Sequence, residues 1–272
     1  MIPQGSARVA RWLARPVSVV QAYGHWLGLA VLIAYLIATP VPGGSDAHNY
    51  YALDLTDPYR NRWADYESFV YSPAFGQLIY PATLLPIEVF YKTLQAINLA
   101  CLAWLLGPLG AALALILPVT RSELSGGQIH LWLAVMCVLG VRYPGVWAFG
   151  LLTKVTPGVG LLYFAARREW GMVGQAAFST AAIVAVSALL LPQAWVGWID
   201  LLAESSTRNV QNFALREWPA AVRLPIAAGL TVMAGWRHRP AALPVIVCFA
   251  LPAIWPGALT LLAAIPRLRQ NR

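Results

Sequence analysis

Two charged residues are candidates for chemistry because their surroundings make a charge costly. Asp46 follows an apolar segment and the pair Gly43-Gly44, and three polar or aromatic residues come soon after it: His48, Tyr50 and Tyr51. A carboxylate just above a membrane, beside aromatic rings, can act as a general base on a hydroxyl group. The alternative is a structural role, in which Ser45 caps a short helix and Asp46 interacts with the helix dipole. Both interpretations predict a short helix with Asp46 in its first turn.

Lys154 is the second candidate, and it is the only lysine well inside an apolar segment. A charge at that depth is costly unless it is paired or hydrated, so an intramembrane cation is a candidate for binding a phosphate or a carboxylate. The alternative is that the long side chain reaches the lipid headgroups. Pro157 predicts a helix break beside Lys154, and such a break would open a cavity.

Two further stretches hold polar groups that can contact a substrate. Gln128 follows the pair Gly126-Gly127 and is a hydrogen-bonding group at membrane depth, although these residues could form a plain turn. His130 has no second histidine or cysteine at ligand spacing, so we expect a hydrogen-bonded interior histidine and no metal site. The second stretch holds Arg208, Asn209, Gln211, Asn212 and Arg216. Its arginines could bind a phosphate through their planar guanidinium groups, and the alternative is a solvated loop.

The composition indicates which elements must position these residues. The chain has 272 residues, of which 59% are hydrophobic and only 11% charged, and its mean hydropathy is +0.60. A soluble domain carries about a quarter charged residues, so the composition excludes a soluble enzyme, and it is too apolar for a disordered chain. The sequence predicts an all-α, polytopic transmembrane bundle of about eight to ten spans.

Several apolar segments are too short to cross a membrane as straight helices. The pairs 108–120/127–141 and 240–255/257–266 are candidates for broken or re-entrant helices, which are tolerated where they line a cavity or lie inside the protein. The three cysteines lie singly in apolar stretches, and their odd number gives no disulfide framework.

Charge placement predicts the topology. With the N-terminus inside, eleven arginines and three acids (Glu88, Glu123 and Glu169) lie on the cytoplasmic side, against six arginines outside. This agrees with the positive-inside rule and predicts a multi-pass plasma (inner) membrane protein with both termini cytoplasmic. The net charge of +8 therefore reflects topology rather than a nucleic-acid partner. We expect one transmembrane domain over 1–272, with an interfacial helix at 1–24 and outer loops at 43–72 and 192–220.

The order of these motifs resembles glycosyltransferase family 87, a family of polytopic enzymes of the GT-C superfamily. The resemblance covers most of the chain, although Ser72 replaces the first proline of a family Pro-Pro pair and the chain is shorter than is usual in the family. The matching elements are Asp46 to Tyr51, Tyr71-Ser72-Pro73 through Leu85-Pro86, Gly127-Gln128, Lys154 to Pro157, Arg167 to Trp170, Leu191 to Trp195, and Asn209 to Arg216.

The resemblance implies transfer of a sugar, typically mannose, from a polyprenyl-phosphate donor to a hydroxyl group of a lipid or glycan acceptor on the outer face. It implies no cofactor and no metal. Asp46 would be the catalytic base, and the residues implied to bind substrate are Lys154, Arg216, Gln128, His48, Tyr50, Tyr51, Asn209 and Asn212. Membrane lipids and a membrane protein are further possible partners. Two alternatives stay open: a non-catalytic membrane subunit of a larger complex, and a lipid or solute transporter with Lys154 as substrate counter-ion.

Overall fold

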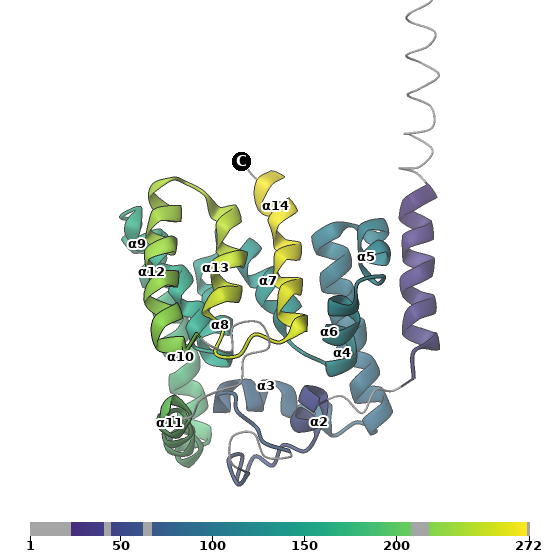
Figure 1. Ribbon diagram of the computed structural model, residues 1–272. Coiled ribbons are helices and arrows are strands. Elements are labelled where there is room, and N and C mark those ends of the chain that lie inside the picture. The colour runs from purple at the N-terminus through teal and green to yellow at the C-terminus, as the bar shows by residue number, and fades with distance from the viewer. Residues whose placement is uncertain (1–22, 41–44, 62–66, 208–217, 271–272) are drawn as a thin grey trace, which may run out of the picture.

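The computed structural model describes residues 23–40, 45–61, 67–207 and 218–270 (Figure 1). Within these ranges the regular elements are α-helices and 3₁₀-helices, and there is no strand. The all-α prediction is therefore confirmed. Except for residues 23 and 24, the predicted interfacial helix lies outside the described ranges.

The first helix, Tyr23–Ala38, precedes the labelled elements. The others, in chain order, are α2 (Ser45–Tyr51), α3 (Pro73–Thr83), α4 (Ile87–Leu106), α5 (Pro108–Ala114), α6 (Pro118–Gly126), α7 (His130–Leu139), η1 (Pro144–Val146), α8 (Trp147–Thr153), η2 (Thr156–Leu161), α9 (Leu162–Ala166), α10 (Trp170–Leu190), α11 (Pro192–Thr207), α12 (Ala220–Trp236), η3 (Pro240–Ala242), α13 (Leu243–Ala250), η4 (Pro256–Ala264) and α14 (Ile265–Gln270).

In the described part of the chain, two helices, α4 and α10, are long and apolar enough to cross a membrane. They differ in their surroundings, because 44% of the apolar window in α4 is buried against only 11% in α10. An apolar helix that is so little covered by its own chain is typical of a surface that faces lipid. The remaining apolar helices are shorter, so a bundle of eight to ten full spans stays a prediction.

Prolines and glycines explain why the predicted segments are divided. The apolar stretch after Gly107 forms α5 and α6, and each of these helices begins with a proline at its first position. Near the C-terminus, α13 ends at Ala250 and η4 begins at Pro256. A proline fits the first turn of a helix and interrupts the interior, so both predicted pairs contain interrupted helices.

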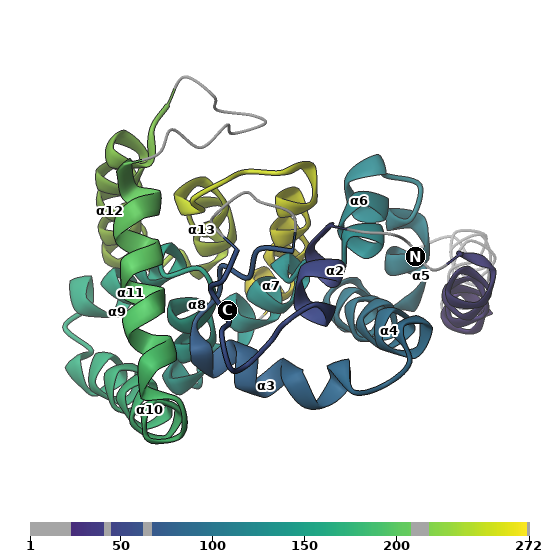
Figure 2. The same ribbon diagram turned by 90° about the horizontal axis from the view of Figure 1, so that it is seen from below.

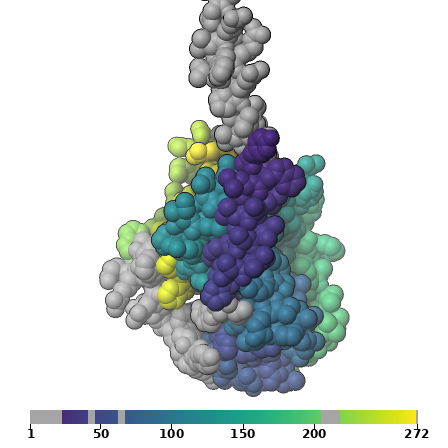
Figure 3. Space-filling view, turned by 90° about the vertical axis from the view of Figure 1, so that its right-hand side faces the viewer, coloured from purple at the N-terminus to yellow at the C-terminus, as the bar shows by residue number. Residues whose placement is uncertain are grey.

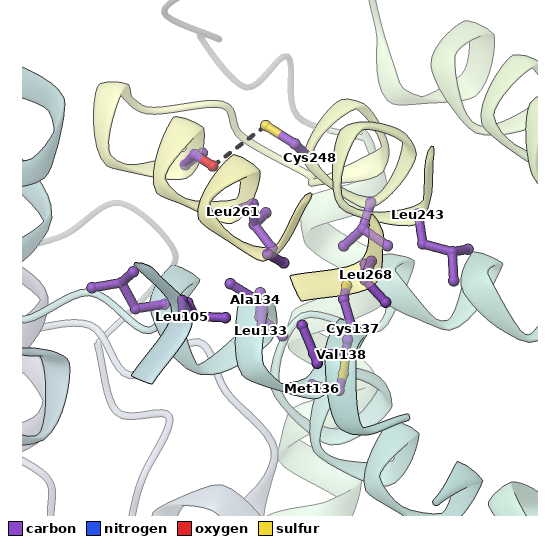
Figure 4. Close-up of a cluster of buried hydrophobic side chains, with 14 of the residues drawn as sticks. Leu105, Leu133, Ala134, Met136, Cys137, Val138, Leu243, Cys248, Leu261 and Leu268 are labelled. Atoms are coloured by element: carbon purple, nitrogen blue, oxygen red, sulfur yellow. Dashed lines mark hydrogen bonds between the residues drawn. The ribbon is translucent and has the colours of Figure 1, made fainter. Parts of the chain in front are cut away.

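The larger core forms around α7, where Leu131, Leu133, Ala134 and Cys137 are fully buried. Figure 4 shows how side chains of α4, α13, η4 and α14 meet this helix. Cys137 and Cys248 are buried free thiols, in keeping with their apolar surroundings in the sequence. Burying apolar surface contributes about 25 cal/mol of stability per Å². This layer is therefore the main support of the helix bundle.

A second, aromatic core lies under one end of the bundle. It contains Tyr50 of α2, Phe69 and Tyr71 before α3, Phe75 of α3 and Phe90 of α4. The helices α2, α3 and α11 lie across this end (Figures 1 and 2), and α11 occupies residues 192–207 of the second predicted outer loop. The first helix instead lies against the outside of α4 and α5 (Figure 3). This aromatic end holds the candidate site residues of α2, which are Asp46, His48, Tyr50 and Tyr51.

Candidate functional site

The helix α2 presents Asp46 at the aromatic end of the bundle. Asp46 lies in its first turn, as predicted from the sequence, and Ala47 and Tyr50 form the buried face of the helix. Ala47 packs directly on Gly127, which has φ of +63° and where an added Cβ would lie only 2.5 Å from the Ala47 Cβ. Only glycine suits both that backbone and that distance, so the Gly127 turn fixes the helix that carries Asp46.

Two buried tyrosines connect to the Asp46 carboxylate through a chain of hydroxyl groups. The Tyr50 hydroxyl donates to the Tyr71 hydroxyl at 2.9 Å, and the Tyr71 hydroxyl donates to Asp46 Oδ2 at 3.3 Å. Burial raises the pKa of both phenols well above the usual value, and the Asp46 charge raises it further. Both phenols therefore stay protonated at working pH, so that Tyr50 donates to Tyr71 and Tyr71 donates to the carboxylate.

Lys154 approaches the same tyrosine from another direction. Its Nζ lies 5.4 Å from the centre of the Tyr71 ring, within the range of a cation–π contact. The chain reaches this place because α8 ends at Thr153 and the Ser72 amide donates to the Leu152 carbonyl at 3.3 Å. The predicted break before Pro157 is confirmed, since the 3₁₀-helix η2 begins at Thr156. The sequence could not place Asp46 and Lys154 relative to each other. In the structure both contact Tyr71, Asp46 at the hydroxyl group and Lys154 at the ring face.

The Lys154 ammonium has no hydrogen bond or salt bridge among the residues that the structure describes. Its side chain is half-buried. A cation in apolar surroundings with donors to spare is suited to an anionic ligand. Carboxylate, phenol and ammonium together form a site that can accept a proton on one side and bind an anion on the other.

The other predicted residues lie around this site rather than in it. His48 Nε2 lies 3.0 Å from Glu67 Oε1, and His48 Nδ1 lies 3.3 Å from the Tyr91 hydroxyl. Tyr51 points to the turn between α3 and α4, where its hydroxyl donates to the Leu85 carbonyl. Three predicted residues are outside the described ranges: Asn209, Asn212 and Arg216.

Gln128 lies behind the site, next to the turn on which Ala47 packs. Its backbone carbonyl accepts a hydrogen bond of 3.0 Å from Asn98 Nδ2. The side chain is 92% buried, and within the described residues its Oε1 has no hydrogen-bond partner. Gly257 faces it so closely that any larger residue would meet both Gln128 and Glu123. Gln128 therefore belongs to the wall behind Asp46.

Glu123 is an acid that the charge count assigns to the cytoplasmic side and whose burial the sequence did not reveal. It occupies a fully buried position, from which its negative charge contributes to raising the pKa of Tyr50 and Tyr71. Its Oε1 accepts from the His130 amide at 2.7 Å, and its Oε2 lies 2.8 Å from His130 Nδ1. Glu123 thus caps α7 and orients the imidazole, which confirms His130 as a hydrogen-bonded interior histidine. An acid seven residues before a histidine, across a Gly-Gly turn, was the available signal.

Tyr71 is the second residue that sequence reasoning missed as a site residue, because it appeared only as the start of a span. Its ring packs in a tilted arrangement against Phe75 at 5.0 Å between centres, and its backbone carbonyl accepts from the Tyr59 hydroxyl at 2.8 Å. These contacts hold the ring between Asp46 and Lys154. In the part of the chain that the structure describes, no group of three or more His, Cys, Asp or Glu side chains is arranged for a metal ion.

Comparison with known proteins gives one positive finding. The family model described as glycosyltransferase family 87 matches residues 69–272. The matched region contains Tyr71, Gln128 and Lys154, and it begins after α2 and Asp46. No curated protein and no solved structure matches the chain. The family match covers most of the chain, and the chain belongs to glycosyltransferase family 87, a family of membrane glycosyltransferases.

Proposed function

We propose that this chain transfers a sugar, mannose, from a polyprenyl-phosphate donor to a hydroxyl group of a lipid or glycan acceptor on the outer face of the plasma membrane. One observation carries the proposal: a carboxylate and an ammonium that has no polar partner among the described residues contact the same buried tyrosine. Tyr71 donates to Asp46 at 3.3 Å and has Lys154 Nζ 5.4 Å from its ring centre. Sugar transfer from a phosphate uses a base for the acceptor hydroxyl and a cation for the leaving phosphate.

Asp46 has the role of general base in this mechanism. Its carboxylate removes the proton of the acceptor hydroxyl while that oxygen attacks the anomeric carbon of the sugar. The bond between the anomeric carbon and the phosphate oxygen breaks from the opposite side, so the configuration inverts. Tyr71 keeps the carboxylate oriented through its hydroxyl group, and it cannot take the proton itself because burial keeps its phenol protonated.

Lys154 has the role of stabilising the leaving group. The departing polyprenyl phosphate gains negative charge as the glycosidic bond breaks, and a pre-positioned ammonium stabilises that charge in the transition state. Arg216 is the further phosphate-binding residue in the proposal, while Gln128 supports the site from the wall behind Asp46. The Tyr71 ring favours the ammonium at one place beside the site, at 5.4 Å from its centre.

An apolar groove between α3 and α4 supports a lipid substrate. Phe75 lines this groove, and its ring also contacts Tyr50 and Tyr71 at 5.6 and 5.0 Å between ring centres. A hydrocarbon chain in the groove would therefore end next to the Asp46–Lys154 site. The groove is lined by Phe75, Leu78, Ile79, Ala82, Phe90, Thr93, Leu94, Ile97 and Trp132.

A transfer assay with Asp46→Asn tests the base. The substrates would be radiolabelled polyprenyl-phosphate mannose and a total membrane lipid extract, with the protein in mild detergent. We expect the turnover rate to fall by about 10²- to 10⁴-fold, as for loss of a general base, while donor binding is retained. Asp54→Asn is the matched control, because Asp54 is an exposed carboxylate of the same loop. Equal transfer by wild type and Asp46→Asn would reject the proposed mechanism.

Native mass spectrometry with polyprenyl phosphate tests the anion site. Lys154→Gln should weaken binding about tenfold or more, because a hydrogen bond to a charged group contributes about 1.5–3 kcal/mol. Arg142→Gln is the control, since Arg142 is an exposed cation that lies at the same 5.4 Å over the Tyr143 ring. If folded wild type binds no polyprenyl phosphate, the lipid-donor mechanism fails, and co-purification should then be used to find the partner of a non-catalytic subunit.

A further inference from the structure

Val155, the residue after Lys154, has a backbone conformation that side chains of its type avoid. Its φ and ψ are +55° and −57°, and the Thr156 amide donates to the Lys154 carbonyl at 2.6 Å. This hydrogen bond across one residue closes a γ-turn with positive φ, which is rare and strained. For a β-branched residue such as valine the strain is greatest, because its two Cγ atoms crowd the backbone.

Hydrogen bonds on both sides keep the chain in this turn. Before it, the Lys154 amide donates to the Gly150 carbonyl at 3.1 Å, which ends α8. After it, the Gly158 amide donates to the Val155 carbonyl at 2.9 Å, and Pro157 is buried against Gly150. Strain of this kind persists only where the surrounding structure over-determines it, and it gathers at functional sites.

Packing of the valine side chain does not explain its presence. Val155 is 40% exposed and belongs to neither buried core, whereas a glycine would adopt the same turn without strain. The residue beside it is Lys154, half-buried and placed on the Tyr71 ring. A stiff, strained turn restricts the directions in which the neighbouring side chain can leave the backbone.

We propose that Val155 is a positioning residue: its strained turn holds the Lys154 ammonium on the Tyr71 ring, ready for a phosphate anion, instead of letting the long side chain move to the lipid headgroups. The phosphate belongs to the lipid donor, so this inference deepens the proposed function and rests on it for the identity of the ligand. The position of the ammonium itself does not depend on any ligand. A lysine that is pre-positioned loses less conformational entropy on binding, and this favours affinity.

Two variants, Val155→Gly and Val155→Ala, separate strain from packing. At an ordinary position glycine is less stable than alanine, because the unfolded chain has more conformations. At a residue with φ of +55° the order is reversed, since only glycine adopts that region freely. We therefore expect the Val155→Gly protein to melt at a higher temperature than Val155→Ala in the same detergent. A lower melting temperature for Val155→Gly would overturn the strain on which the proposal rests.

The position of the ammonium can be measured without a ligand. The chain has only two lysines, Lys92 and Lys154, so reductive methylation with ¹³C-formaldehyde gives two side-chain signals in an NMR spectrum and keeps both charges. Lys154 methyl groups over the Tyr71 ring should show an upfield shift that Tyr71→Leu removes. Val155→Gly should move this signal toward the value of free dimethyl-lysine, and Val155→Ala should move it less. Lys92, held by other contacts, is the internal reference.

Binding of polyprenyl phosphate completes the test. The flexible Val155→Gly turn should raise the dissociation constant about tenfold relative to wild type, as expected for lost pre-organisation, with Val155→Ala between the two. An unchanged Lys154 signal in Val155→Gly overturns the proposal whatever the binding result. If wild type binds no polyprenyl phosphate while the Lys154 signal still moves in Val155→Gly, the proposed function fails and the positioning role of Val155 stands.

Discussion

Arg223 and Lys154 are both cations in apolar surroundings, and the chain satisfies them in opposite ways. Arg223 is fully buried in α12. Its guanidinium donates to four backbone carbonyls at 2.7–3.0 Å, those of Trp218, Phe249, Leu251 and Pro252. Lys154 is half-buried, and its ammonium lies over the face of the Tyr71 ring without a hydrogen bond to any described residue.

The difference separates a structural cation from one that is available for a ligand. The carbonyls bound by Arg223 include those at the C-terminal end of α13, where the helix dipole favours a positive charge. Arg223 therefore fastens the end of α13 to the residues just before α12. A fully satisfied polar group rigidifies a fold, while a buried polar group with spare donors calls for an explanation, and an anionic substrate supplies one for Lys154.

The largest expected effect on stability is that of Arg223→Met. The variant leaves four carbonyls without their donor, and each buried acceptor that is left unsatisfied costs about 1–3 kcal/mol. Its free energy of unfolding in detergent should fall by about 4 kcal/mol or more, measured by denaturant titration. Transfer activity per folded molecule should change little, in contrast to Lys154→Gln. Arg142→Met, at an exposed cation, is the control, and equal losses in the two variants would mean that the carbonyl contacts of Arg223 do not stabilise the fold.

Lys92 offers an intermediate case and a smaller expected effect. Its ammonium donates to the carbonyls of Leu36 and Thr39 at the end of the first helix, and it lies 3.4 Å from Gln95 Oε1. Lys92→Met should lower the free energy of unfolding by about 1–2 kcal/mol, since it removes these hydrogen bonds but exposes the carbonyls near the helix end to other partners. Hydrogen exchange should accelerate most in residues 23–38. Loss of donor binding with unchanged exchange would instead make Lys92 a ligand-binding cation like Lys154.

The sequence revealed the role of Lys154 better than that of Arg223. Lys154, with Pro157 after it, was recognisable because a lysine inside an apolar segment and a proline are both local signals. Arg223 was counted among the six arginines of the outer side, because charge counting treats an arginine near a segment end as solvated, and three of its four carbonyl partners lie 26–29 residues away. The burial of Glu123 was missed for the same reason.

The short helix at Asp46 and the helix breaks were predicted, because capping residues, glycines and prolines act over a few residues. That Asp46 and Lys154 contact the same tyrosine could not be predicted. It depends on Tyr71, which bonds to Asp46 from 25 positions away and contacts Lys154 from the other side. Such a contact is set by the packing of α2, α3 and α8 rather than by any local pattern.

The smallest expected effect concerns Arg60, a solvent-exposed cation that lies 3.6 Å from Asp54 and completes the series. Two hydrogen bonds from Thr56 lower the pKa of the Asp54 carboxyl, and Arg60 contributes less to this shift. The folded state therefore favours the carboxylate, and the unfolded chain binds more protons in the acidic range. The stability that Asp54 contributes is complete above its unfolded pKa and is lost as the pH falls through its folded pKa.

Thr56→Val should reduce this acid-sensitive contribution more than Arg60→Gln. The measurement is the melting temperature between pH 3 and pH 7, a range around the usual carboxyl pKa of about 4. A larger effect of Arg60→Gln would mean that an exposed ion pair stabilises this loop, against the rule that such pairs contribute little.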